Sequence, residues 1–289
     1  MKLQEMNKED LIDIKSLDIF PFMRVIWHSG DSKRIWGPKF ENSKPLHHKS
    51  EYEMVRQGFR KCATMHFTNS SFDTYIERIL EDGLFWLPIQ RTKSYGGFAH
   101  KHYPTSADDP NSSVYGVLCS DIESGNKFRE ASGYFGNVES SDHGVIGGLL
   151  GFPECDYEFF NDVWLEGFFD PMWQHAVNAD SVEMIGERTL KIKESIYNTQ
   201  LLRYTGHRFN SHFPHSLSCK KSIEVGKNWE KVGNSLNSAA VKDLKDILRL
   251  PAKWTCLHGI AQIETPHFTV VTNSMPTKEK WTILFEASD

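Results

Sequence analysis

The apolar residues of this chain repeat with a helical period in some segments and a strand period in others, which predicts a mixed α and β protein. The stretch 70–83 places its apolar side chains on one helical face, with Ser71 able to cap the first turn and Gly83 suited to a left-handed end. Residues 22–29 and 113–122 are short apolar runs, and we expect strands there.

The middle of the chain is expected to be mainly helical. Residues 140–151 predict a helix that ends at Gly151, and a second helix follows with Pro153 at its first position and acidic residues in its first turn. A longer helix is expected over much of 182–205, and the segment 218–236 predicts another.

The C-terminal segment differs from the middle in composition. Its stretches KWTCLHGIAQIET, PHFTVVTNS and KEKWTILFEA are rich in β-branched and aromatic residues, and turns with proline separate them. The expected fold class is therefore α+β, with a helical central region and a small C-terminal antiparallel sheet.

A boundary is expected close to residue 110. The region 91–112 is rich in Gly, His, Pro, Ser and Asp, which is typical of a long loop. We therefore expect an N-terminal α/β part over 1–110 and a metal-binding domain with the C-terminal β segment over 111–289.

Composition and charge exclude several classes of protein. With 39% apolar and 25% charged residues, the chain is typical of a folded globular protein. The net charge of -5 argues against a global nucleic-acid surface, and no apolar run approaches the length of about 18 that suggests a membrane span. Five widely spaced cysteines do not suggest a disulfide framework, so we expect a cytoplasmic protein without a membrane partner and leave its oligomeric state open.

Two similar stretches carry the candidate chemistry. GFPEC (151–155) and HFPHSLSC (212–219) each contain a Phe-Pro pair and bring a cysteine to the start of a predicted helix. The partial positive charge of a helix N-terminus favours the thiolate, which is the form that binds metal. If the two helix starts face each other, four residues become candidate metal ligands: Cys155, His212, His215 and Cys219.

Two cysteines and two histidines suit tetrahedral zinc, with iron as the second choice. Asp156 is an adjacent oxygen donor that could replace one ligand or leave a coordination position open. The spacing differs from that of a zinc finger, and each residue also has an ordinary interpretation. A single cysteine is often a small buried apolar residue, and a histidine near a helix start often forms a local hydrogen bond.

Three segments resemble a poorly characterised group of prokaryotic and viral proteins: GGLLGFPECD, LLRYTGHRFNSHFPHSLSC and WTCLHGIAQIETPHF. That group carries Leu-Gly-Tyr-Pro-x-Cys-Cys, His-x-Pro-Cys-x-x-x-Cys and His-Gly-Ile-Ala-x-Ile-x-Thr-Pro segments. The resemblance covers roughly residues 128–270 and implies motif boundaries without implying a reaction. This chain has Asp156 and His215 where the group has cysteines, and both can still bind metal.

These features predict a metal-dependent enzyme that acts by hydrolysis or deamination on a polar small molecule, nucleobase or nucleotide. Glu154, Asp156 or Glu264 would transfer the proton, because a carboxylate near a metal-bound water is a common general acid or base. The alternative is a non-catalytic binding or scaffold protein in which the same zinc is structural, and a third hypothesis is a metal-free protein with cysteines in its core.

Overall fold

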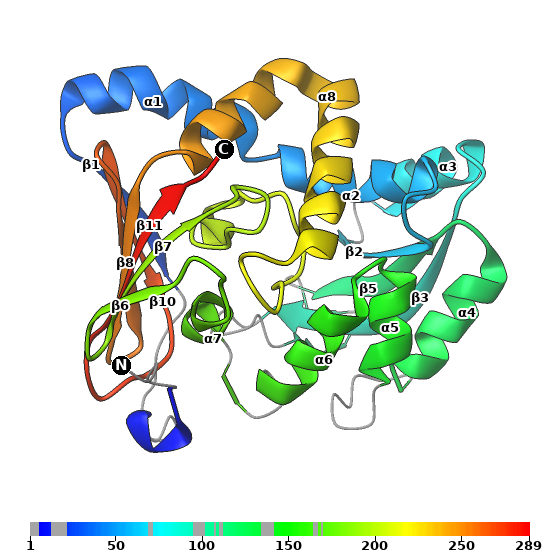
Figure 1. Cartoon of the computed structure of the whole chain (residues 1–289). Coiled ribbons are helices and arrows are strands. Elements are labelled where there is room, and N and C mark those ends of the chain that lie inside the picture. The colour runs from blue at the N-terminus through cyan, green and yellow to red at the C-terminus, as the bar shows by residue number, and fades with distance from the viewer. Residues whose placement is uncertain are drawn as a thin grey trace.

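The computed structural model of this chain contains two β-sheets with helices packed around them (Figure 1). It describes residues 6–12, 22–68, 72–94, 102–106, 108–109, 112–133, 142–163, 167–168 and 170–289. The larger sheet lies at one side of the molecule and the smaller at the other, with α8 crossing between them. The fold class is α+β, as the sequence predicts.

The larger sheet has seven strands and contains both the first and the last strand of the described chain. Neighbouring strands are antiparallel except for β11 and β7, which run parallel. In spatial order the strands are β1 (Met23–Trp27), β10 (Phe268–Asn273), β9 (Ile260–Glu264), β8 (Ala252–Leu257), β11 (Trp281–Ala287), β7 (Thr189–Glu194) and β6 (Glu183–Gly186).

This sheet is larger than the small C-terminal antiparallel sheet that the sequence predicts. Strands β8 to β11 form as expected, but β1, β6 and β7 extend them into a mixed sheet. The helix predicted over much of 182–205 is wrong, because β6 and β7 occupy its first half. In β7 the buried residues Leu190 and Ile192 alternate with exposed lysines, which is the two-residue period of a strand.

The smaller sheet has four antiparallel strands, in the order β2 (Cys62–Thr68), β5 (Ser112–Cys119), β3 (Phe85–Ser94) and β4 (His102–Pro104). Part of the loop expected over 91–112 is therefore strand, while residues 95–101, 107, 110 and 111 lie outside the described residues. Because β5 pairs with both β2 and β3, residues on the two sides of position 110 share one sheet.

The α-helices are α1 (Gly30–Ser43), α2 (Leu46–Arg56), α3 (Phe72–Glu81), α4 (Ile122–Ala131), α5 (His143–Leu149), α6 (Glu154–Val163), α7 (Met172–Val177) and α8 (Lys220–Leu248). The predicted helix over 70–83 is confirmed by α3, and the one over 218–236 by the first part of α8. None of the helices that the structure describes combines the length and the apolar character that crossing a membrane requires.

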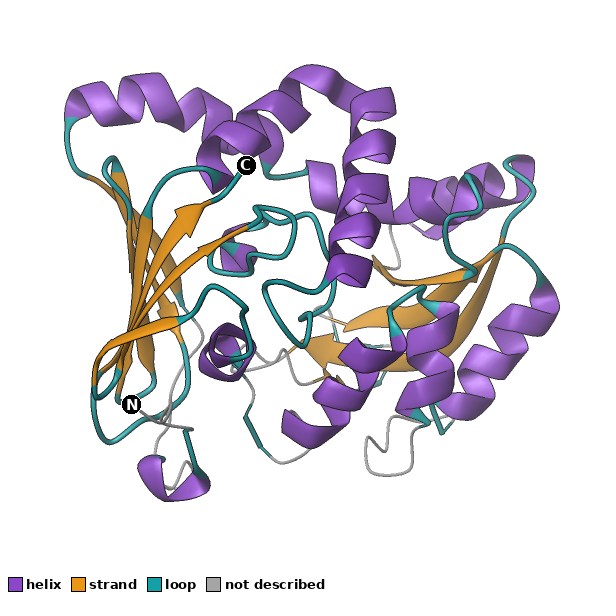
Figure 2. Ribbon diagram, viewed as in Figure 1, coloured by secondary structure: helices purple, strands orange, loops and turns teal. Residues whose placement is uncertain are grey.

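Helices cover both faces of the smaller sheet, as Figure 2 shows. Successive strand residues point to opposite faces, so Ala63 and Leu118 pack towards α2 and α3, while Cys62 and Cys119 pack towards α4. Each face of the smaller sheet therefore contributes to a separate apolar cluster.

The main core lies between the larger sheet, the helices α1, α7 and α8, and the segment 196–217. In it Trp173 of α7 meets Trp281 of β11 edge to face, with ring centroids 4.5 Å apart. Helix α8 bends at Asn237, whose backbone is extended and whose Oδ1 accepts a hydrogen bond from the Ala240 N–H at 3.0 Å. Asn237 therefore caps the second half of α8, and each half can follow a different neighbour.

Helix α8 packs closely on the segment before it, and Gly226→Ala tests this contact. A Cβ at position 226 would lie 2.8 Å from the Tyr197 Cβ, which is too close for two carbon atoms that are not bonded to each other. We expect the substitution to lower the free energy of unfolding by about 1–3 kcal/mol in urea titrations. Gly148→Ala in α5 is the matched control, since nothing lies within 4 Å of its added Cβ, and it should be neutral or stabilising. Equal stability of the two variants would contradict the close packing.

Candidate metal centre

Two pairs of side chains, which are distant from each other in sequence, meet where the first turns of α6 and α8 approach each other. Cys155, Asp156, His215 and Cys219 each offer one ligand atom, and these atoms all lie within 4.8 Å of one another. The two sulfur atoms are 3.9 Å apart. Two thiolates on one tetrahedral zinc, each bonded at about 2.3 Å, lie roughly 3.8 Å apart, so the sulfur spacing fits such an ion.

Local sequence explains how the first pair reaches the site. Gly151 has a positive φ of 73°, which lets the chain reverse after α5, and Pro153 then precedes the first turn of α6. Cys155 and Asp156 lie in that turn. On the other side Cys219 is the N-cap residue of α8.

The Asp156 carboxylate is the centre of the hydrogen-bond network. Its Oδ2 lies 2.7 Å from the His212 Nε2 and accepts a short hydrogen bond from the Ser222 hydroxyl. Its Oδ1 accepts from the His215 N–H at 2.8 Å and lies 2.9 Å from the His215 Nδ1. One carboxylate therefore joins α6, the segment 212–215 and α8.

The ionisation of these groups is set by their surroundings. Burial alone would raise the pKa of the Asp156 carboxyl, but the hydrogen bonds from His212, Ser222 and the His215 N–H outweigh it and hold that pKa well below its usual value. Burial, the Asp156 charge and the neighbouring Cys219 raise the pKa of the Cys155 thiol to about 12. Burial and nearby negative charge therefore disfavour the Cys155 thiolate that the helix N-terminus was expected to favour. A bound cation would offset that negative charge.

Three of the four predicted metal ligands belong to this cluster. Cys155, His215 and Cys219 lie together, while His212 lies behind Asp156, with its ring 4.4 Å from that of Phe152. Asp156, predicted as a proton-transfer group, takes the fourth place in the cluster. Figure 1 locates both first turns, of α6 and α8, at the centre of the molecule.

The other two predicted proton-transfer residues lie at the surface. Glu154 is an exposed residue in the first turn of α6, next to Cys155 in sequence. Glu264 ends β9, where its Oε2 pairs with the Lys253 Nζ of β8 at 3.2 Å. His258 occupies the turn between β8 and β9 with a φ of 51°.

Buried amides that the sequence analysis missed hold the second half of the site. Asn198 donates to the carbonyls of Leu217 and Cys219, both at 3.0 Å. Asn210 donates to the Asn198 Oδ1 at 2.9 Å and to the Ser222 carbonyl at 3.0 Å. The positions of Asn198 and Asn210 in the sequence show no regular spacing to HFPHSLSC. Ser222 lies one helical turn after Cys219, so a helical repeat could have identified it.

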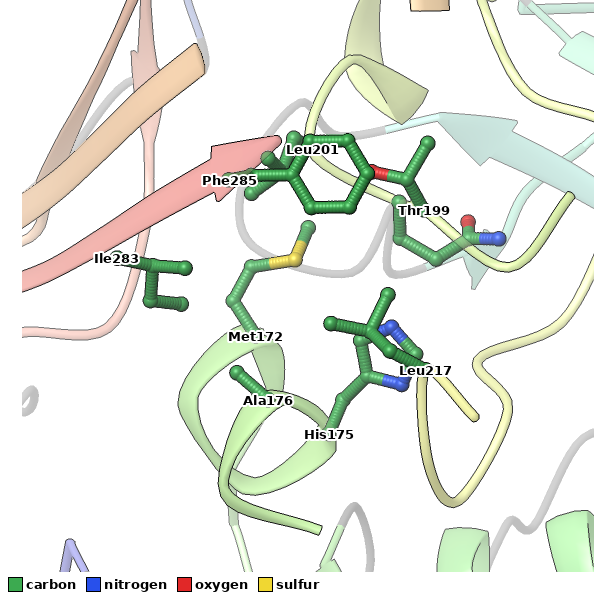
Figure 3. A pocket seen from close by; sticks show the side chains of 9 residues that line it. Met172, His175, Ala176, Thr199, Leu201, Leu217, Ile283 and Phe285 are labelled. Carbon is green, nitrogen blue, oxygen red and sulfur yellow. The ribbon is translucent and has the colours of Figure 1, made fainter. Parts of the chain in front are cut away.

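Helix α7 supports the same segment from the other side. The His175 Nδ1 lies 2.7 Å from the Pro214 carbonyl oxygen, and the Asn178 Nδ2 donates to the His215 carbonyl at 2.9 Å. Figure 3 shows a small pocket beside His175, lined also by Met172, Leu217 and Phe285. Its volume of about 10 Å³ is too small for a substrate.

No family model matches this chain, and neither the curated proteins nor the solved structures contain a significant match. The resemblance to the prokaryotic and viral group therefore stays a prediction.

Asp156→Asn tests the central carboxylate. In asparagine an NH₂ group replaces one of the two carboxylate oxygens of Asp156, each of which lies beside two donors. At least one buried donor then loses its acceptor, so we expect the free energy of unfolding to fall by about 1–3 kcal/mol. Because the pKa of Asp156 is lower in the folded than in the unfolded chain, this contribution is present at neutral pH and is lost as pH falls below about 4. Urea titrations at several pH values measure both effects.

Asp142→Asn is the control, because Asp142 caps α5 through one N–H contact that asparagine can also make. Its stability should stay within about 0.5 kcal/mol of the wild type. Asp156→Asn with unchanged stability at neutral pH would contradict the role of the carboxylate.

Proposed function

We propose that this protein is a metal-dependent enzyme in which Cys155, His215 and Cys219 bind zinc, with iron as the second choice. The observation that supports it is the close group of two sulfur atoms, an imidazole and a carboxylate at two helix starts. Sulfur and nitrogen donors together favour zinc over the oxygen-preferring magnesium and calcium ions.

The hydrogen bonds of Asp156 favour three protein ligands over four. Both of its oxygens already accept hydrogen bonds, so coordinating a metal would compete with those donors. If the His215 Nδ1 donates its proton to Asp156, Nε2 carries the lone pair for the metal, in the carboxylate–histidine–metal arrangement common at zinc sites. The fourth position would then be open to water or substrate.

A bound zinc with one open position would lower the pKa of its water towards neutrality and so favour hydrolysis or deamination. Glu154, exposed beside Cys155, is the residue we propose as the proton-transfer group, because Asp156 is too strongly stabilised as the anion to accept a proton near neutral pH. The His215 side chain is 35% exposed, which leaves this side of the site open to a small polar substrate such as a nucleobase or nucleotide.

The second candidate function is a binding or scaffold protein with a closed, structural zinc site. It is favoured by the Asp156 oxygen that lies within 4.8 Å of the other three ligand atoms, and by the two separate segments, 155–156 and 215–219, that the cluster joins. Four protein ligands without water would indicate this function.

Metal content tests the ligand set. We expect about one zinc per chain, measured by plasma emission spectroscopy on protein purified without added metal, and X-ray absorption should report two sulfur neighbours near 2.3 Å. Cys219→Ser should remove most of the metal. Cys62→Ala is the matched control, since Cys62 is a buried residue of β2 outside the cluster. Metal retained by Cys219→Ser with the same sulfur count would contradict this assignment.

Removal of the metal separates the two functions. For the enzyme, treatment with a chelator should abolish turnover while circular dichroism and a cooperative thermal transition persist, because the apolar cores of both sheets do not depend on the metal. For a structural zinc, the chelated protein should lose its cooperative transition together with the metal.

A further inference from the structure

A second group of polar side chains, of opposite charge, lies where α2, residue 60 and the segment 203–208 meet. We refer to His47, Arg60, Arg203 and Arg208 as the arginine cluster. The side chains of His47 and Arg60 are only 1% and 3% exposed, and the two other arginines are half-buried. The charges of all three arginines act on the His47 ring and, with burial as the larger cause, lower its pKa.

The carboxylates near this cluster do not balance its charge. Glu51 lies 3.7 Å from the Arg60 Nη2 and 3.9 Å from the His47 Nε2. Among the described residues, neither Arg203 nor Arg208 has a carboxylate within 4.0 Å. Asp170 reaches Arg203 only at longer range, and burial raises the pKa of Asp170 to about 6. In the described ranges of the chain, these three guanidinium groups therefore have one carboxylate within 4.0 Å, that of Glu51 beside Arg60.

Several donors in the cluster also have no acceptor. Within the described part of the chain, the Nε atoms of Arg60 and Arg208 are buried and form no hydrogen bond, and neither do the two ring nitrogens of His47, of which the neutral ring offers one as a donor. The bonds that the guanidinium groups do form go to main-chain carbonyls, from Arg60 to Glu51 at 3.2 Å and from Arg208 to Arg203 at 2.7 Å. Buried charged donors without acceptors are unfavourable, so this arrangement calls for an anion.

Aromatic rings hold these side chains in place. His47 stacks on Trp229 of α8 with ring centroids 4.5 Å apart and an interplanar angle of 11°. The Arg60 guanidinium lies over the same Trp229 ring at 5.3 Å, and that of Arg203 lies 4.2 Å from the Phe213 ring centroid. The cationic groups are thus oriented before any ligand arrives, which reduces the entropy lost on binding.

We propose that the arginine cluster binds a phosphate group, either as free phosphate or as part of a phosphorylated metabolite. Phosphate offers several terminal oxygens and up to two negative charges, and guanidinium groups bind it through paired hydrogen bonds. The Glu51 side chain, which pairs with Arg60, is 22% exposed, so the cluster reaches solvent at this carboxylate. This inference does not depend on the metal centre.

Calorimetric titration of the full chain with inorganic phosphate tests the proposal. We expect saturable binding with one site per chain, and Arg208→Gln should weaken the affinity at least about ten-fold through loss of a charge-assisted contact. Arg34→Gln is the matched control, because Arg34 is 73% exposed on α1 and pairs only with Asp31 among the described residues. It should bind phosphate like the wild type.

Glu51→Gln provides a test in the opposite direction. Removal of this competing carboxylate should tighten phosphate binding several-fold, which a purely structural role of the cluster would not produce. This variant also keeps the proposal testable if Arg208→Gln does not fold. Metal content measured in both variants should equal that of the wild type, which keeps this result separate from the metal assignment.

Titration with a nucleoside 5′-monophosphate separates the two sources of phosphate. Binding at least about ten-fold tighter than inorganic phosphate assigns the site to a phosphorylated metabolite, and equal affinity assigns it to the free anion. Absence of saturable binding for both probes at millimolar concentration would overturn the proposal, as would unchanged affinity in both Arg208→Gln and Glu51→Gln.

Discussion

The buried charge of Asp156 organises the centre of this protein. A carboxylate removed from water is costly unless donors surround it, and here the donors come from His212, His215 and Ser222. Each donor belongs to a different part of the chain from α6, so the requirement to satisfy one charge fixes how three segments meet. The positions of Cys155 and Cys219, adjacent to this network, follow from it.

Packed elements hold the hydrogen-bond network of Asp156 on both sides. The first half of α8 carries Cys219 and Ser222 to the site, while its second half, after the bend at Asn237, packs towards the larger sheet. Buried amides and α7 fix the segment in between. A site built on such elements can present several ligands to one ion without a large rearrangement.

Two regions of opposite electrostatic character lie on the same scaffold. The candidate metal centre gathers two thiols and a carboxylate, which favour a cation, and the arginine cluster gathers guanidinium groups, which favour an anion. The two are connected through the chain: a Cβ at Gly151 would lie 3.0 Å from the Arg60 Cβ, and Gly151 leads directly into the first turn of α6. An enzyme acting on a phosphorylated substrate would use both charges, although each site can be tested alone.

The sequence by itself determined the local features of this protein. Helical period and capping residues predicted α3 and the start of α8, and the content of β-branched and aromatic residues between turns predicted β8 to β11, because these signals depend on neighbours within a few residues. The Phe-Pro motifs likewise pointed to Cys155, His215 and Cys219. Only the tertiary structure decided that Asp156, and not His212, completes the cluster, that β6 and β7 replace a helix, and that Arg60 and Arg208 both come near His47. Those outcomes depend on contacts between residues far apart in the chain, whose free energy of burial and charge pairing no local pattern contains.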